Sequence, residues 1–282
     1  MPTFKITLAY DGTPFVGWQR QASGTSIQGL LEDALRELDN RDVTLVGAGR
    51  TDAGVHALGQ VATFSLERTM AADTVMRALN ARLPAEVRVV SAEEAAETFH
   101  ARFSARRKTY RYRIWNAEVL SPFERQYAWH LTGALDVNRM AEAAQRFEGR
   151  HDFAAFQAAG APTSTTDRVI SLSRIVIASN RPTAKGTEDT EDTRHKPPCG
   201  AGFGLDVHLV LGGGALIVYE ITGDGFLRHM VRNIVGTLVE IGRGRRGPAW
   251  IDDVLALRDR ARGGPTAPAQ GLILVRVEYG DL

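Results

Sequence analysis

The sequence predicts an α+β fold of two ferredoxin-like halves that share a mostly antiparallel sheet, with helices on one face and a central active-site cleft. Segments that alternate apolar and polar residues, typical of half-buried strands, are interspersed with segments whose apolar residues recur every three or four positions, typical of amphipathic helices. In the first hundred residues the order is strand, helix, strand, strand, helix, strand, which is the ferredoxin-like order. The second half repeats this theme.

The N-terminal half is expected to span residues 1–105. Its elements, in chain order, are a strand at 4–10, a helix at 27–38, strands at 43–48 and 61–66, a helix at 73–82 and a strand at 87–91. Thr25 and Gln28 have the spacing of a capping box at the start of the first helix. Asp73 is expected to cap the second helix, and Pro84 follows its end.

The C-terminal half is expected to span residues 106–282. Its elements are a strand at 109–115, a helix at 136–147, strands at 168–178, 204–211 and 215–222, helices at 227–241 and 251–258, and a strand at 272–279. The first strand places Tyr110 and Tyr112 on one face and Arg111 on the other. A polar loop at about 180–202 contains three prolines and an acidic run, and it lacks periodicity.

Composition excludes several classes of protein. The chain of 282 residues is 44% hydrophobic and 24% charged, which is typical of a globular protein. No run of 18 apolar residues is present, and the start has no signal-peptide pattern, so we expect a cytoplasmic protein without a membrane span. Cys199 is the single cysteine, which excludes an internal disulfide and a cysteine-rich zinc site. We therefore expect no metal.

The distribution of charge says more than the net charge of +1. Basic residues gather in three clusters, at 102–113, 243–246 and 258–262, whereas acidic residues gather at 188–192. A cluster of this kind is most often a solvated face. Three clusters in one chain favour a groove that follows nucleic-acid phosphates, although only moderately.

The most informative segment is a turn with a glycine near each end. It reads Gly49-Arg50-Thr51-Asp52-Ala53-Gly54-Val55-His56-Ala57. Glycine permits backbone angles that other residues avoid, so the turn can be tight and Asp52 can project from it. Arg50 is expected to pair with Asp52 and keep it ionised. An ionised aspartate on a rigid loop between strands suits a nucleophile or a base, although an Asx-turn or a helix cap is the commoner role of such a residue.

This nine-residue string resembles the active-site signature of the TruA family of tRNA pseudouridine synthases, with Asp52 at the position of the catalytic aspartate. Further segments are similar to motifs of the same family: Tyr10–Thr13, Gly17–Gln19, Ser26–Gln28, Lys108–Tyr112, Gly149–Phe153, Met230–Gly236 and Ala269–Leu272. Together they extend from residue 4 to residue 279, so the resemblance covers the whole chain. The main departure is the segment around 180–202.

The resemblance implies the isomerisation of uridine to pseudouridine at positions 38, 39 and 40 of the tRNA anticodon stem-loop, by a homodimer and without a cofactor. It implies that Tyr110 contacts the base. Arg50 would orient Asp52 and fill the space that the flipped base leaves. Because Arg232 lies on a largely apolar helix, it needs a carboxylate partner, for which Asp52 is the candidate. Leu272 would form an apolar wall of the uracil pocket, although a strand-core role suits it nearly as well.

Other interpretations stay open at this stage. The competing class is an RNA-binding module of two RRM-like sheets that holds RNA without altering it, but the aromatic pattern of such modules is absent. Hydrolysis of a glycosidic bond usually requires a second carboxylate, for which Asp224 or Asp152 would have to serve. Asp224 suits a helix N-cap better. His56 and His229 have small or apolar neighbours, which favours structural roles.

Overall fold

The computed structural model describes residues 1–158, 160, 165–178 and 214–280, and its strands form one sheet. The strands are β1 (Thr3–Tyr10), β2 (Val46–Gly47), β3 (His56–Ser65), β4 (Val87–Ala95), β5 (Ala105–Asn116), β6 (Trp129–Leu131), β7 (Gly149–Asp152), β8 (Asp167–Ala178), β9 (Ala215–Gly223) and β10 (Leu272–Tyr279). The helices are α1 (Ile27–Asp39), α2 (Ala72–Asn80), α3 (Val137–Gln145), α4 (Met230–Gly242) and α5 (Trp250–Leu257). The protein is therefore α+β, as the sequence predicts.

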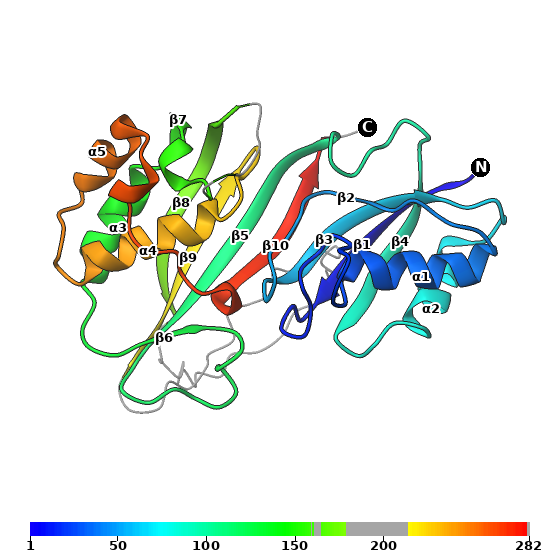
Figure 1. The fold of residues 1–282 in the computed structure, drawn as a ribbon, viewed down its shortest axis with the longest axis horizontal. Coiled ribbons are helices and arrows are strands. Elements are labelled where there is room, and N and C mark those ends of the chain that lie inside the picture. Colours follow the sequence, from blue (N-terminus) through cyan, green and yellow to red (C-terminus); the bar gives the residue numbers. More distant parts are fainter. Residues whose placement is uncertain (159, 161–164, 179–213, 281–282) are drawn as a thin grey trace, which may run out of the picture.

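The sheet order is β4-β1-β3-β10-β5-β9-β8-β7, with β2 beside β3 and β6 beside β5. Most neighbours are antiparallel, but β10 runs parallel to β3 and β6 runs parallel to β5, so the sheet is mixed. Figure 1 shows β5 and β10 at the centre, with α1 and α2 on one side and α3, α4 and α5 on the other.

The first part of the chain has the predicted order of elements, with differences at their ends. Ser26, not Thr25, caps α1, because its hydroxyl accepts the Gly29 N–H at 3.2 Å. Asp73 lies inside the first turn of α2 rather than at its cap. The strand expected at 43–48 shortens to the two residues of β2. Cap identity depends on backbone angles that the sequence pattern alone does not determine.

The second part of the chain contains two strands that the sequence analysis missed. These are β6 and β7, of three and four residues, and neither is long enough to show an alternating pattern. The remaining predictions for described residues agree with β5, α3, β8, β9, α4, α5 and β10 to within a few residues. The strand expected at 204–211, the loop at 180–202 and Cys199 lie outside the described residues.

The C-terminal strand β10 joins the two parts of the sheet. Ile273 of β10 is paired with His56 of β3 and with Arg111 of β5. Leu274 is paired with Ala57 and with Tyr110. The last strand of the chain therefore brings the end of the Asp52 turn next to the strand that carries Tyr110.

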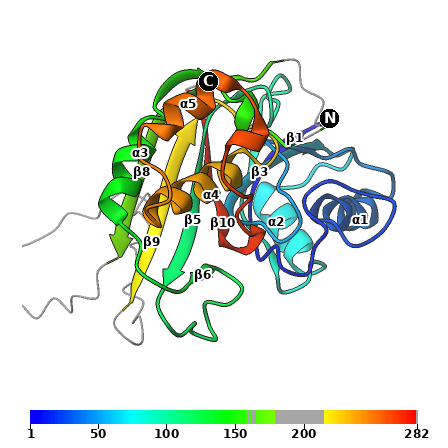
Figure 2. The same cartoon turned by 60° about the vertical axis from the view of Figure 1, so that its left-hand side comes forward.

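One hydrophobic core connects the sheet with the helices. Tyr110 and Tyr112 of β5 belong to the same buried cluster as the apolar residues of α1, α2, α3 and α4, so these helices pack on one face. Arg111 and Glu220 pair on the other face, at 2.6 Å between Nε and Oε2. Most of α4 is buried. In Figures 1 and 2 this helix crosses the face of β9, with its N-terminal end toward β10.

The described residues contain neither a membrane-spanning helix nor a cluster of metal ligands. No described helix is both long enough and apolar enough to cross a bilayer. No group of three or more described histidine, cysteine, aspartate or glutamate residues is arranged to hold a metal ion.

Candidate active site

Side chains of the neighbouring strands β1 and β3 form hydrogen bonds with the turn between β2 and β3. The hydroxyls of Tyr10 and Thr51 are hydrogen-bonded at 2.9 Å, and the Gln60 amide donates to the Gly49 carbonyl at 2.9 Å. Burial raises the pKa of Tyr10 to about 12, so its phenol stays protonated. Gly54 has the expected positive φ of 75°, whereas the φ of Gly49 is not positive. The positive φ at Gly54 explains why glycine is required there.

Two glycines of the N-terminal segment lie directly under this turn. A Cβ on Gly12 would lie 2.0 Å from the Val55 carbonyl oxygen, and one on Gly17 would lie 2.7 Å from the Thr51 carbonyl oxygen. The Trp18 N–H donates to that same Thr51 oxygen at 3.0 Å. The residues at 10–19 therefore serve as the floor of the turn, and they can do so only because two of them lack side chains.

Asp52 extends from this turn to the N-terminal end of α4. Its Oδ2 accepts a hydrogen bond from Arg232 Nη1 at 3.1 Å, as the sequence analysis expected. Arg232 is itself fixed, because its Nε donates to the Ala267 carbonyl at 2.7 Å. The Asp52 side chain is 28% exposed, and that of Arg232 is 16% exposed. The carboxylate thus has a rigid cationic partner and remains accessible from outside.

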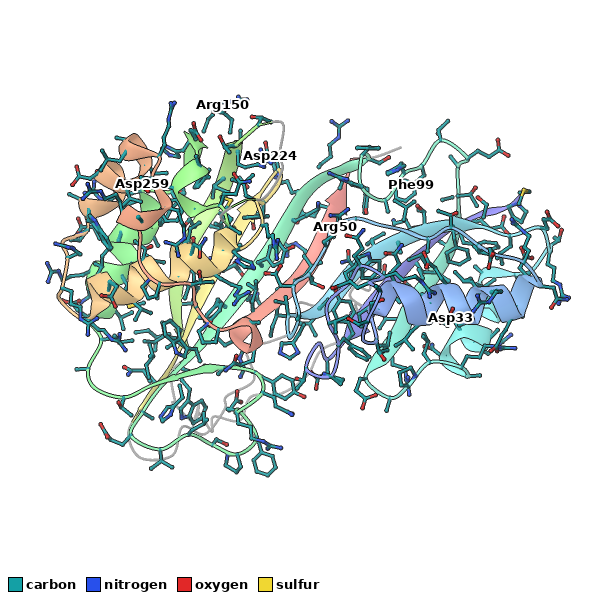
Figure 3. The ribbon with its side chains drawn as sticks, viewed as in Figure 1. Asp33, Arg50, Phe99, Arg150, Asp224 and Asp259 are labelled. Atoms are coloured by element: carbon teal, nitrogen blue, oxygen red, sulfur yellow. The ribbon has the colours of Figure 1, made fainter. Side chains whose placement is uncertain are left out.

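The expected pair of Arg50 with Asp52 is not formed. Arg50 is exposed and makes no hydrogen bond or ion pair with any described residue; Figure 3 shows it at the middle of the molecule, near β10. Such a pair would also carry an entropic cost. A flexible surface arginine loses rotamer freedom when it pairs, whereas Arg232 is already ordered by α4 and by its bond to Ala267.

His229 is a residue of this site whose role the sequence analysis missed. Its Nε2 lies 3.5 Å from Asp52 Oδ2. It occupies the N-cap of α4 with φ 62°, a left-handed conformation that is uncommon for a residue with a Cβ. Burial lowers its pKa, and nearby arginines act in the same direction against the charge of Asp52, which favours the neutral imidazole. No sequence pattern announces a strained N-cap, so only the fold reveals this contact.

Tyr110 lies close to the aspartate on the helix-covered face of β5. It is 7% exposed and packs edge-on against Phe226, with ring centroids 5.1 Å apart. Burial raises its pKa, and the charge of Asp52 raises it further, so the phenol is neutral near pH 7. Its hydroxyl has no hydrogen-bond partner within the described part of the chain. This leaves one polar group near Asp52 free to bind another molecule.

Leu272 and Tyr112 line the same region from β10 and β5, where they are paired. Leu272 is 6% exposed and belongs to the main core. Tyr112 is fully buried, and its hydroxyl donates to the Pro268 carbonyl at 2.7 Å. Tyr112 therefore packs in the core, as expected for it. The burial of Leu272 is compatible both with a pocket wall and with a strand-core role.

Comparison with known proteins gives these groups a context. The chain matches the family model for tRNA pseudouridine synthase over residues 6–104 and 143–280. The chain belongs to the tRNA pseudouridine synthase family. The proteins named tRNA pseudouridine synthase A of Moorella thermoacetica and Myxococcus xanthus are 44% and 42% identical to it, each over 281 residues. These matches cover 99% and 100% of this chain, and 100% and 93% of the respective relatives.

Membership of the tRNA pseudouridine synthase family makes the protein an isomerase. The contacts of Asp224 and Asp152, the two candidates for a second carboxylate, agree with a site that has a single aspartate. Asp224 does not cap α4; its Oδ1 accepts the Val169 N–H at 3.1 Å. Asp152 pairs with Arg258 at 3.0 Å. Neither shares a partner with Asp52 among the described residues, so neither is arranged as the second carboxylate of a glycosidase.

His56, which belongs to the nine-residue string around Asp52, is buried and bonded to backbone groups, as expected of a structural residue. It is 4% exposed, and its Nδ1 accepts the Gly12 N–H at 3.0 Å. Its Nδ1 also lies 3.1 Å from Asp11 Oδ1, and its Nε2 lies 2.9 Å from the Gln126 carbonyl and 3.2 Å from the Gln270 carbonyl. Burial lowers its pKa, which agrees with a neutral ring. His56 thus ties three segments together behind the turn.

Proposed function

We propose that the protein converts uridine to pseudouridine at positions 38, 39 and 40 of the tRNA anticodon stem-loop, with Asp52 as the catalytic carboxylate. Membership of the tRNA pseudouridine synthase family supports the reaction, and the resemblance to the TruA signature supports the positions. The observation that carries the assignment of Asp52 is its geometry. It is a partly exposed carboxylate on a glycine-bounded turn, with its charge balanced by Arg232.

The reaction is balanced without a second substrate. The bond between ribose C1′ and uracil N1 breaks, the base rotates, and C1′ forms a bond with C5. The proton on C5 is lost and N1 gains one, so reactant and product are isomers. A carboxylate can contribute as a nucleophile at C1′ or C6, or as a base at C2′. Asp52 has the chemistry for each of these paths.

The contacts of Asp52 distinguish its two oxygens. Arg232 and His229 both approach Oδ2, at 3.1 and 3.5 Å. Oδ1 has no hydrogen-bond partner among the described residues. We therefore assign the reacting oxygen to Oδ1, while Oδ2 remains held. A carboxylate fixed in this way loses little orientational freedom when it attacks.

The other residues of the proposal act on the base. A uridine within a stem has to leave the stack before it can react, at a cost of a few kcal/mol. Tyr110 would stack on the extruded uracil, and its free hydroxyl would help to remove the C5 proton. Leu272 would close the pocket on its apolar side. Arg50, which is exposed and unpaired in the described structure, would fill the gap left in the RNA stem.

We also propose that residues 1–105 and 106–282 are two ferredoxin-like halves and that the protein acts as a homodimer. The order and pairing of β1 to β4 with α1 and α2 support the first half. The proposal of a homodimer rests on the family resemblance. In a dimer one subunit would hold the body of the tRNA while the other modifies it. Light scattering of the protein alone and with tRNA tests the dimer.

The deciding experiment compares wild type with Asp52→Asn on an unmodified tRNA transcript, and it scores pseudouridine formation and tRNA binding together. Wild type is expected to form pseudouridine at positions 38–40, whereas the variant binds tRNA with similar affinity and forms none. Asp33→Asn is a matched control, because Asp33 is a half-exposed carboxylate of α1 that pairs with arginines, as Asp52 does, but lies far from Arg50 and β10 (Figure 3). A variant as active as wild type would refute the role of Asp52. An RNA-binding module without activity is the alternative, and binding by wild type without any turnover would favour it.

A further inference from the structure

Lys108 reaches the active-site turn from β5. It is two residues before Tyr110 and on the same face of the strand, about 7 Å along it. Its Nζ lies 3.4 Å from the point where a Cβ on Gly49 would be. Gly49 is three residues before Asp52. Lys108 is thus placed beside both the strand and the turn that form the active site.

Among the described residues, Lys108 has cations near it and no partner of opposite charge. Its side chain makes no hydrogen bond or ion pair with any of them. Its cross-strand neighbours are Gly223 on β9 and Val277 on β10, neither of which is charged. Burial, together with the charges of Arg102 and Arg168, lowers its pKa to about 8. A partly enclosed lysine that is repelled by two arginines is unfavourable unless an anion joins them.

Arg102 and Arg168 differ from two arginines of β5 that have carboxylate partners. Arg111 and Arg113 are on the opposite face of β5 and pair with Glu220 at 2.6 Å and Glu124 at 2.8 Å. Arg102, in contrast, is exposed, and none of the described carboxylates pairs with it.

Arg168, at the start of β8, donates through Nη1 to the carbonyl oxygens of Thr165 and Asp167, which orients its guanidinium without neutralising it. Glu220 and Glu124 therefore compensate Arg111 and Arg113, whereas no described carboxylate pairs with Lys108, Arg102 or Arg168.

We propose that Lys108, Arg102 and Arg168 bind a phosphate group of the tRNA backbone next to the target uridine. Three positive charges suit a phosphodiester, which is an anion at every accessible pH. The distance of Lys108 from Tyr110 along β5 places this phosphate beside the base that Tyr110 contacts. The inference rests on the proposed function, because it takes tRNA as the ligand and Tyr110 as the residue that contacts the target base.

An amine with a pKa near 8 could instead carry a proton in the reaction. The two roles make opposite demands on arginine at this position. Arginine binds phosphate but does not release its proton, so it replaces a phosphate-binding lysine and does not replace a proton carrier. Lys108→Arg therefore separates the roles, and Lys108→Gln removes both.

The first experiment measures the affinity of an unmodified tRNA transcript for wild type, Lys108→Gln, Lys108→Arg and Lys5→Gln at several salt concentrations. Lys5 is the matched control, since it pairs with Glu93 on β4 at 2.7 Å. We expect Lys108→Gln to bind about tenfold more weakly, and its plot of log affinity against log salt to be less steep by about 0.7 to 0.9. Lys108→Arg and Lys5→Gln should bind as wild type does.

The second experiment repeats the binding measurement between pH 7 and pH 9. Wild-type affinity should fall as pH rises through about 8, because Lys108 loses its charge there. Lys108→Arg should remove this dependence. Arg102→Gln provides a second variant whose exposed side chain can be removed without disturbing the core, and it should also weaken binding and lower the salt dependence.

The proposal would be overturned if Lys108→Gln and Arg102→Gln both bound tRNA with the affinity and the salt dependence of wild type. So would a Lys108→Arg variant as defective as Lys108→Gln. If wild type forms no pseudouridine but Lys108→Gln still weakens tRNA binding, the phosphate site stands and the proposed reaction fails. The two hypotheses can therefore fail separately.

Discussion

Replacing Gly12 with alanine is expected to displace the turn that carries Asp52. The new Cβ would lie 2.0 Å from the Val55 oxygen and 2.6 Å from its carbonyl carbon, whereas ordinary contact begins at 3.4 Å. One of the two backbones must therefore move by about 1.4 Å. The Val55 N–H donates to the Asp52 carbonyl at 3.1 Å, so this shift is transmitted to the aspartate.

The expected magnitudes follow from this geometry. Overpacking against backbone is at the upper end of the usual range, about 3 kcal/mol. Alanine also reduces the conformational entropy of the unfolded chain, which stabilises the folded state by about 0.5 kcal/mol because the φ of Gly12 is not positive. The net loss of about 2.5 kcal/mol corresponds to a fall in melting temperature of about 5 °C. A misplacement of about 1 Å should slow the reaction on the order of 100-fold.

Thermal unfolding and single-turnover pseudouridine formation at 25 °C, where the variant is still folded, measure the two effects. Gly247→Ala is the control, because a Cβ there would meet no described atom within 4 Å and its φ is not positive. It should match wild type in both assays. A Gly12→Ala protein that is folded and reacts at the wild-type rate would refute the reasoning that this glycine positions the Asp52 turn.

Three further predictions concern single side chains. Arg232→Lys keeps the charge but loses the fork that binds both Asp52 and the Ala267 carbonyl, so single-turnover rates should fall at least tenfold while tRNA affinity stays within twofold. Tyr110→Phe should bind tRNA normally and form pseudouridine about 100-fold more slowly in a chromatographic assay of digested tRNA, if its hydroxyl helps to remove the C5 proton. Burial opposes the charge of Asp39, yet two backbone N–H groups and a neighbouring arginine together lower its pKa. Asp39→Asn should therefore destabilise the fold by about 2 kcal/mol in urea unfolding at pH 7. A lowered pKa stabilises the folded state above about pH 4, so this deficit should shrink as pH falls below that value; a deficit that stays constant down to pH 3 would contradict the argument.

Local patterns predicted the elements well where a segment is long enough to repeat. The alternation at residues 4–10 and the three-to-four spacing at 27–38 correspond to β1 and α1, because each pattern reports which side of a segment is buried. Short strands such as β6 and β7 bury too few residues to produce a pattern. The helix caps were predicted wrongly because several residues near a helix end can act as the N-cap, and the backbone conformation decides which one does.

The sequence by itself determined the family and the α+β class, and it led to Asp52 as the candidate catalytic residue. Each of these resides in contiguous residues, such as the signature around Asp52, where identity and spacing are enough. It also led to the Arg232 partner, since an arginine on a buried helix requires a carboxylate.

Apart from the pair of Arg232 with Asp52, only the tertiary structure decided which charges meet. It separated Arg50 from Asp52, brought His229 to the carboxylate, and left Lys108 beside the turn without an anionic partner among the described residues. The contacts of His229 and Lys108 depend on β10, which lies between β3 and β5 and fixes two distant segments relative to each other. Electrostatic partners depend on distance in space, and no local pattern in a chain encodes that distance.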